Sequence, residues 1–299
     1  MSTDPHLGTS DAGATVFTSR WLLFAWALIV AATVWCMRDA WSDITGIALR
    51  DEEQSHIILV PLIAVWLSWI RRLRLRRLRP NGTLFGPLIM LIGWAASYYG
   101  YTHSLQAAWH AGAVMAAVGA LVAGLGVNTL LRLAPAFAVL IFLVPTPGTI
   151  RFAISGPLQT ASAAITQGIL ETFGVPVERS SNLLTLNGRE VAVAEACNGM
   201  RMVLALILVS YAFAFSIPLR PYARALVLFA SPAAAIFCNI IRLIPTVLLY
   251  GYASSSVADS FHDISGWLML PLAFLLLHAV YSVLGWAQIP VTRFNLSYH

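Results

Sequence analysis

Charged residues are scarce in this sequence. They make up 10% of the 299 residues, whereas hydrophobic residues make up 59% and the mean hydropathy is +0.76. A soluble globular domain carries about 25% charged residues, so the composition excludes that class and indicates a chain that has the membrane as its solvent. The net charge of +5 comes from arginines placed between apolar runs, where membrane topology explains them, and no nucleic-acid role is predicted.

Cysteines are also few, and no two of them form a CxxC pair. Cys36, Cys197 and Cys238 lie far apart, which excludes a zinc-finger spacing and a disulfide framework. The polar leader at 1–20 lacks the basic segment that opens a cleaved signal peptide, so the first apolar run is predicted to be a retained helix. We predict neither a metal nor a cofactor.

Long apolar runs make up most of the sequence. A helix crosses a bilayer with about 20 apolar residues, and the sequence offers about eight such runs. They lie at 21–38, 56–70, 84–101, 107–126, 134–150, 197–217, 225–250 and 266–286. The sequence therefore predicts an all-α integral membrane protein with about eight transmembrane helices, of which those at 21–135 form an N-terminal group. A short cytoplasmic tail is expected at 288–299.

The arginines orient these helices. The loop after the second run holds six of them and no acidic residue, which places it in the cytoplasm by the positive-inside rule; the alternative is a patch for lipid headgroups or nucleic acid. They are Arg71, Arg72, Arg74, Arg76, Arg77 and Arg79. Counting outward from this loop leaves three segments on the outer face: the acidic loop before residue 56, residues 151–196 and residues 251–265.

The long outer segment has two parts. Residues 151–173 are apolar enough for an amphipathic helix along the interface, or for a re-entrant segment. Residues Val177 to Ala194 alternate and contain Asn187-Gly188, which predicts a small β-hairpin. Its second strand, Arg189 to Ala194, runs towards Cys197.

Cys197 opens the sixth apolar run at its outer end. A helix N-terminus favours the thiolate, which is the nucleophilic form of cysteine; the alternative is a small packing residue. Arg201 follows one helical turn later on the same face. It is expected to hold the thiolate, to bind an acidic group of a substrate, or to pair with Glu195, which otherwise orders the hairpin.

Arg242 interrupts the seventh run, within Asn239-Ile240-Ile241-Arg242. Pro245 lies three residues on and predicts a broken helix there. The guanidinium either extends to the lipid headgroups or stabilises an oxyanion in a site of low dielectric constant.

His262 is expected in a loop before the last run, again on the outer face. It is either a solvated surface residue or a general acid and base. Asp263 is a candidate to orient it, although adjacent residues seldom face each other. An outer-face group of Cys, Arg and His indicates acyl transfer through a thioester.

Three blocks of this sequence resemble the signature blocks of the exosortase and archaeosortase family, in the family's order. They are Glu195-Ala196-Cys197-Asn198-Gly199-Met200-Arg201, Asn239-Ile240-Ile241-Arg242 and His262-Asp263-Ile264-Ser265-Gly266-Trp267. The likeness covers roughly residues 140–270, within a predicted catalytic transmembrane core at 136–287. It implies that Cys197 is the nucleophile, Arg242 the transition-state stabiliser and His262 the proton-transfer residue.

The resemblance also implies a substrate. It would be a secreted protein whose C-terminal sorting signal has a Pro-Glu-Pro-like motif, a membrane helix and a basic tail. The enzyme, in the cytoplasmic (inner) membrane among its lipids, would cleave near the motif on the outer face and transfer the protein to an unknown acceptor. The rival functions are a polytopic transporter or channel, a protease that uses water as acceptor, and a non-catalytic subunit of a polysaccharide export system.

Overall fold

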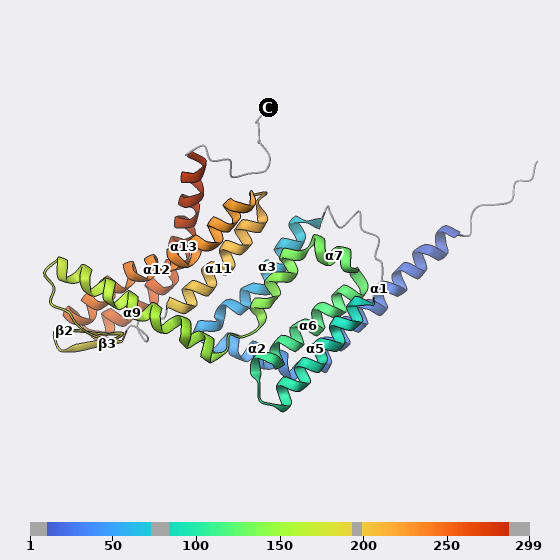
Figure 1. The fold of residues 1–299 in the computed structure, drawn as a ribbon, viewed down its shortest axis with the longest axis horizontal. Helices are drawn as coiled ribbons and strands as arrows, with labels where there is room; N and C mark the ends of the chain where they lie inside the picture. Colours follow the sequence, from blue (N-terminus) through green and yellow to red (C-terminus); the bar gives the residue numbers. More distant parts are fainter. Residues whose placement is uncertain (1–10, 73–83, 193–198, 287–299) are drawn as a thin grey trace, which may run out of the picture. The chain divides into compact units, whose positions relative to one another are not determined.

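The structure is a computed structural model that describes residues 11–72, 84–192 and 199–286. Helices make up most of these residues (Figure 1). They divide into two units that are described separately below. The first unit comprises residues 1–46 and 71–144, and the second comprises residues 47–70 and 145–299.

In the first unit, a pair of antiparallel helices packs through glycines. Helices α5 (Phe85–Thr102) and α6 (Gln106–Leu125) carry these glycines seven residues apart, at 86, 93 and 100 on α5 and at 112 and 119 on α6. A Cβ atom at any of them would lie 2.2–2.4 Å from a backbone atom of the other helix. Small residues let membrane helices approach this closely, because apolar side chains gain nothing by leaving lipid.

Around this pair lie α1 (Asp11–Cys36), most of α2 (Arg38–Arg50), α7 (Val127–Arg132), α8 (Ala134–Ala138) and the 3-10 helix η2 (Val139–Leu143). Helix α1 packs on α6, where the indole N–H of Trp26 donates to the carbonyl of Ala120 at 3.0 Å. The imidazole of His110 lies against Asp43, with 2.9 Å between Nε2 and Oδ2.

The predicted span at 134–150 is wrong as a single helix. Helix α8 (Ala134–Ala138) is followed by η2 (Val139–Leu143), which ends at Leu143, and α9 (Gly148–Thr172) starts only after Pro145-Thr146-Pro147. Two prolines, one residue apart, remove N–H donors and disfavour helical backbone in the residues before them. The expected helix at 151–173 is present as α9, and its placement along the interface stays a prediction.

The second unit holds the rest of the helices. They are the 3-10 helix η1 (Glu52–Ile58), α3 (Leu59–Ile70), α9, α11 (Gly199–Ser216), α12 (Pro221–Tyr252) and α13 (Ser255–Trp286). Helix α11 packs against η1, α3, α9, α12 and α13. The helix that begins two residues after Cys197 therefore lies at the centre of this unit.

Helix α12 is continuous, so the predicted break near Pro245 is wrong. Its buried residues recur every three or four positions, from Ser231 through Ala235 and Asn239 to Arg242 and Thr246. Pro245 takes the hydrogen-bond donor away from one carbonyl, and the hydroxyl of Thr246 adds a bond of 2.7 Å to the carbonyl of Arg242 nearby. Side-chain bonds of this kind and packed neighbours let membrane helices contain proline.

A three-stranded antiparallel sheet lies beside these helices. Its order is β1 (Glu178–Ser180), β2 (Leu183–Leu186) and β3 (Arg189–Ala192). The predicted turn at Asn187-Gly188 is confirmed, because both residues have the positive φ angles of a tight hairpin. The prediction of one hairpin missed β1, which pairs with β2 across a turn at Ser181.

The sheet is fixed to the turn between α12 and α13. Arg189 Nη1 donates to the carbonyls of Tyr250 and Ala253 at 3.2 and 2.8 Å. Beneath this contact, the buried side chain of Leu186 lies over Gly251, where a Cβ would come within 2.4 Å of Leu186 Cδ2. Strand β3, which precedes residues 193–198, is thereby tied to the helix that carries Arg242.

We expect Gly251→Ala to lower the free energy of unfolding by about 1–3 kcal/mol, because the new methyl group displaces a packed leucine. The variant should therefore unfold at a lower temperature than the wild type. The matched control is Gly168→Ala in α9, where a Cβ meets nothing within 4 Å. That control should stabilise by about 0.5–1 kcal/mol through helix propensity. Thermal unfolding in detergent, followed by circular dichroism, measures both. Equal shifts for the two variants would contradict the packing described.

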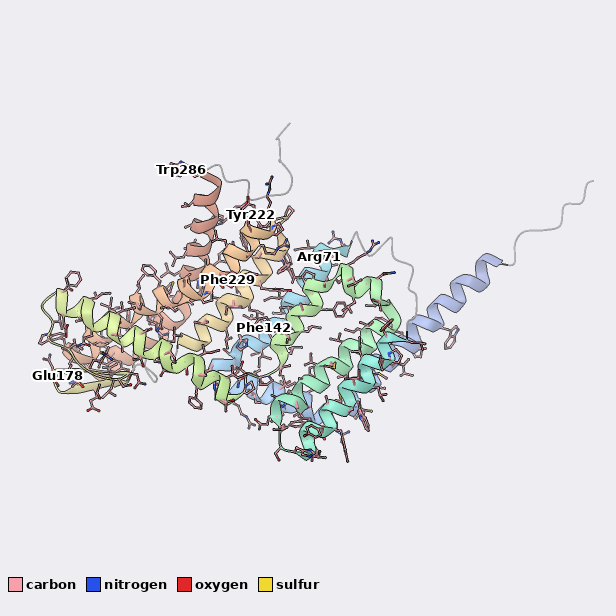
Figure 2. The ribbon with its side chains drawn as sticks, in the orientation of Figure 1. Arg71, Phe142, Glu178, Tyr222, Phe229 and Trp286 are labelled. Atoms are coloured by element: carbon pink, nitrogen blue, oxygen red, sulfur yellow. The ribbon has the colours of Figure 1, made fainter. Side chains whose placement is uncertain are left out.

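Among the described residues, three helices are long and apolar enough to cross a membrane, namely Glu53–Ile70, Gln106–Leu125 and Pro221–Tyr252. The interrupted pair of α8–η2 and α9 makes a fourth if it counts as one span. The predicted total of about eight spans stays a prediction. Large apolar side chains are exposed along these helices, such as Phe229 on α12 (Figure 2). This exposure suits helices that face lipid.

Candidate functional site

The structure brings Arg242 and His262 together. Arg242 lies on the buried face of α12 with 9% of its surface exposed, and its Nη2 donates to the backbone carbonyl of His262 on α13 at 3.4 Å. The same carbonyl accepts a bond of 3.0 Å from the hydroxyl of Ser265, which is buried. Two of the three sequence blocks therefore meet where α12 packs on α13.

His262 lies on a helix, so its predicted place in a loop is wrong. Helix α13 begins at Ser255, eleven residues before the apolar run that was predicted as the last span. Residues 255–265 contain no proline or glycine, and the carbonyl of Ser254 accepts from the N–H groups of Val257 and Ala258. The helix fixes the imidazole relative to Arg242 more rigidly than a loop would.

The two nitrogens of the His262 ring have different surroundings. Nδ1 lies 3.4 Å from Asp263 Oδ1, and the side chains are 26% and 82% exposed. This distance is longer than an ordinary hydrogen bond, and solvent screens so exposed a carboxylate. Nε2 is buried and has no hydrogen-bond partner among the described residues, which makes it the nitrogen suited to exchange a proton with a bound group.

Asn239 lies one helical turn before Arg242, on the same face of α12. It is 3% exposed, and its Oδ1 has no hydrogen-bond partner among the described residues. Buried polar atoms are nearly always bonded. Asn239 Oδ1 is thus a buried acceptor without a bond, one helical turn from Arg242.

The remaining candidates cannot be placed in the same way. Cys197 and Glu195 lie outside the described residues, and Arg201 lies on the first turn of α11, where its side chain is also outside the description. The roles of all three stay predictions. Of the other two cysteines, Cys238 is buried among Val203, Leu206 and Ala235, as expected of a packing residue.

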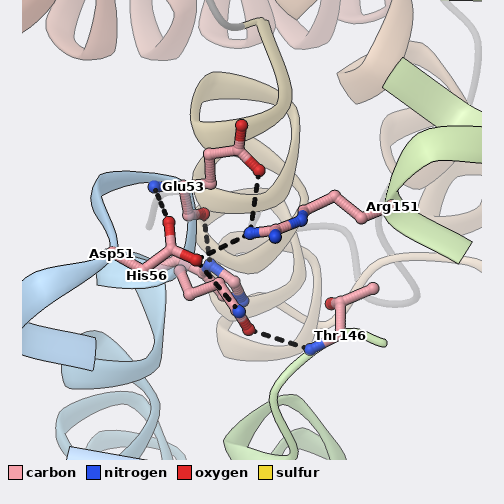
Figure 3. Close-up of polar contacts among 6 residues, drawn as sticks. Asp51, Glu53, His56, Thr146 and Arg151 are labelled. Atoms are coloured by element: carbon pink, nitrogen blue, oxygen red, sulfur yellow. Dashed lines mark hydrogen bonds and ion pairs between the residues drawn. The ribbon is translucent and has the colours of Figure 1, made fainter. Parts of the chain in front are cut away.

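A polar network at the start of α9 was missed by sequence analysis (Figure 3). Arg151 Nη1 lies 2.6 Å from Asp51 Oδ2 and 3.1 Å from Glu53 Oε2. Gln54 donates to Asp51 and accepts from the N–H of Thr146 at 2.9 Å, within the bend between η2 and α9. Because η1 also packs on α11, the network joins the start of α9 to a helix that contacts α11.

A signal for this network was present in the sequence. Asp51 precedes Glu52 and Glu53 and caps η1 by accepting from the N–H of Glu53 at 3.0 Å, a pattern that marks helix starts. Sequence analysis used these carboxylates only as markers of the outer face. The sequence indicates no partner for Arg151, because no sequence pattern relates two residues that are 100 positions apart.

The electrostatics of Asp51 follow from these contacts. Burial alone raises the pKa of this carboxyl, but the hydrogen bonds from Arg151, Gln54 and the Glu53 N–H outweigh burial and lower the pKa below its ordinary value of 3.8. A lowered pKa in the folded state means that the carboxylate stabilises the fold above about pH 3.8. That contribution is lost as the pH falls through the folded-state pKa.

We expect Arg151→Met to lower the free energy of unfolding by about 1–3 kcal/mol at neutral pH, because two half-buried carboxylates lose their shared cation. The same substitution should reduce the acid-induced loss of stability, since the pKa of Asp51 would be lowered less when only Gln54 and the Glu53 N–H remain as partners. Thermal unfolding at neutral pH and below pH 4 checks both effects. Arg179→Met, which breaks an exposed contact with Gln167, is the control and should change little. Equal pH profiles for wild type and Arg151→Met would contradict this account.

Comparison with known proteins gives one match. The family described as transmembrane exosortase matches residues 41–279 of the chain. No curated protein and no solved structure gives a match. The matched range includes the three sequence blocks, the Asp51 network and the sheet.

Proposed function

Because the chain belongs to the transmembrane exosortase family, we propose that it is a cysteine transpeptidase of the cytoplasmic membrane with its active site on the outer face. Its substrates are secreted proteins with a C-terminal sorting signal: a Pro-Glu-Pro-like motif, a membrane helix and a basic tail. The observation that carries the proposal is the contact between Arg242 and His262, since it supports a joint role for two separate blocks of the sequence.

The proposed reaction has two steps. In the first, the Cys197 thiolate attacks the scissile carbonyl, Arg242 stabilises the oxyanion, and His262 protonates the leaving amine, so that the C–N bond breaks and a thioester forms. In the second, His262 takes a proton from the acceptor, which attacks the thioester and releases the thiolate. The buried Nε2 of His262 is the atom suited to both proton transfers.

Supporting roles fall to the other candidates. Asn239 lies beside Arg242, Asp263 is the carboxylate that lies near the His262 ring, and Glu195 orders the segment before Cys197. The placement of the enzyme in the membrane has a physical reason, because the scissile bond lies at the membrane surface next to the substrate's own helix. Arg242 lies on the helix Pro221–Tyr252, which is one of the described helices that are long and apolar enough to cross a membrane.

We expect Arg201 to bind the glutamate of the substrate motif. Arg201→Glu should then lower processing about tenfold to a hundredfold, because a charge-assisted hydrogen bond is replaced by repulsion between like charges. A substrate whose motif carries lysine in place of glutamate should restore processing by this variant. The measurement is the processed fraction on a gel for the four combinations of enzyme and substrate. Failure of the exchanged pair to recover would remove this role from Arg201.

Co-expression with a tripartite-tail substrate tests the proposed function. The wild-type protein should remove the tail, and mass spectrometry of the new C-terminus should show an added acceptor. A free carboxylate there would indicate hydrolysis by a protease. Added hydroxylamine should compete with the acceptor and leave a hydroxamate, because it cleaves thioesters. A tail that stays intact in the presence of the wild-type protein, for every substrate with this signal, would overturn the proposal.

A further inference from the structure

Helix α9 carries a row of small polar residues on one face. Ser155, Gln159, Ser162 and Thr166 recur at steps of four, three and four, which is the spacing of one helical face. Ser162 and Thr166 have no exposed surface. Burying a polar group inside a protein is unfavourable unless it is hydrogen-bonded, so each buried hydroxyl of this row requires a partner.

Packing clusters place Ser162 at the level of Asn239 and Arg242. Before Ser162 on α9, Leu158 packs on a cluster made of Val203 and Leu206 of α11 with Ala235 and Cys238 of α12. After it, Ala163 belongs to the cluster that contains Leu243 and Val247 of the same helix. Asn239 and Arg242 lie between these two clusters along α12, so the buried face of α9 meets the site of Arg242 at Ser162.

Ser162 and Asn239 both have a buried polar atom without a bond. Neither Ser162 Oγ nor Asn239 Oδ1 has a hydrogen-bond partner among the residues that the structure describes, and the same holds for Thr166 Oγ1 on α9 and Ser210 Oγ on α11. Leaving such an atom unbonded opposes folding by about 1–3 kcal/mol. By contrast, the hydroxyls of Thr160 on α9 and Ser231 on α12 donate to carbonyls of their own helices.

The two atoms complement a peptide unit. A serine hydroxyl donates, and an asparagine carbonyl oxygen accepts, which matches one backbone C=O and one backbone N–H. A segment that is to be cleaved must be extended at the scissile bond, so its backbone groups have no partners in a helix of their own. Near the membrane interior these groups require partners from the protein.

We propose that Ser162 and Asn239 form a subsite that binds the backbone of the substrate beside the scissile bond. Ser162 donates to a carbonyl of the extended segment, and Asn239 Oδ1 accepts from an N–H. The assignment rests on the proposed function and extends it, because it makes α9 a wall of the active site. It also gives the site a specificity for extended peptide that does not depend on side chains.

The test measures binding separately from chemistry. A fluorescent peptide with the Pro-Glu-Pro-like motif and its flanking residues is titrated into the detergent-solubilised Cys197→Ala protein, with Ser162→Ala or Asn239→Leu added. Each added substitution should weaken binding about tenfold, the value of one lost hydrogen bond. In the protein with Cys197 intact, each should raise KM more than it lowers kcat. The melting temperature should stay unchanged or rise, because an unbonded polar atom is removed.

Thr160→Ala on α9 and Ser231→Ala on α12 are the controls, because each removes a hydroxyl that already donates to a carbonyl of its own helix. Neither control should change peptide binding. Wild-type affinity in Ser162→Ala and Asn239→Leu would overturn the subsite. So would a fall in melting temperature for both, because the two groups would then be bonded within the protein. Absence of binding by the Cys197→Ala protein with both residues intact would also overturn it. Processing by Cys197→Ala would instead overturn the proposed nucleophile, and peptide binding would still decide the subsite.

Discussion

Replacing Cys197 by alanine is expected to lower processing of a tripartite-tail substrate by at least about a thousandfold, because no other group in the proposed mechanism forms the thioester. Cys197→Ser should be nearly as inactive, since an alcohol stays protonated at neutral pH and is a far weaker nucleophile than a thiolate. The processed fraction, followed over time on a gel, gives the rate for each variant.

The control for this result is Cys36→Ala, which removes an exposed cysteine of the first unit. It should process the substrate at the wild-type rate. Melting temperatures of all variants must agree, so that a lost activity reports chemistry and not unfolding. Equal processing by wild type and Cys197→Ala would exclude Cys197 as the nucleophile, whereas absence of processing by both would favour the transporter as the function.

Arg242→Gln is expected to lower processing about a hundredfold to a thousandfold, the effect of removing one donor from an oxyanion site. Glutamine keeps an N–H₂ group on a buried side chain but removes the positive charge. The fold should therefore survive, because no unpaired charge is left buried. Processing rate and melting temperature are measured side by side, and KM should change less than kcat because the oxyanion exists only in the transition state.

Ser265→Ala separates this role from a structural one. Ser265 Oγ and Arg242 Nη2 both donate to the carbonyl of His262, Ser265 from the same helix α13 and Arg242 from α12, so a variant at either position removes one bond to that carbonyl. If Arg242 acts only by holding that carbonyl, Ser265→Ala should be about as inactive as Arg242→Gln. We expect Ser265→Ala to retain most of the activity, since the charge of Arg242 remains.

Several helices were predictable because their limits depend on local composition. The runs predicted at 84–101 and 107–126 appear as α5 and α6 with ends within one residue. The hairpin turn at Asn187-Gly188 is equally local, since these two residues adopt the positive φ angles that such a turn needs. The membrane class follows from hydropathy alone.

Predictions failed where neighbours outside the local sequence decide. A proline predicts a helix break, yet α12 continues past Pro245 within packed surroundings and with a bond from Thr246. Polar residues at 255–265 read as a loop, yet they form the first three turns of α13. In both cases the packing of α12 and α13 on each other and on α11 acts together with bonds inside each helix.

The sequence by itself determined that the protein is a helical membrane protein and predicted which three blocks carry its chemistry, because hydropathy and motif order are properties of the sequence alone. Only the tertiary structure decided that Arg242 meets the carbonyl of His262, that Arg151 binds Asp51 and Glu53, and that Ala163 of α9 shares a cluster with Leu243 and Val247 of α12. These pairs are 20 to 100 residues apart, and side chains that far apart meet only where helix packing brings them together.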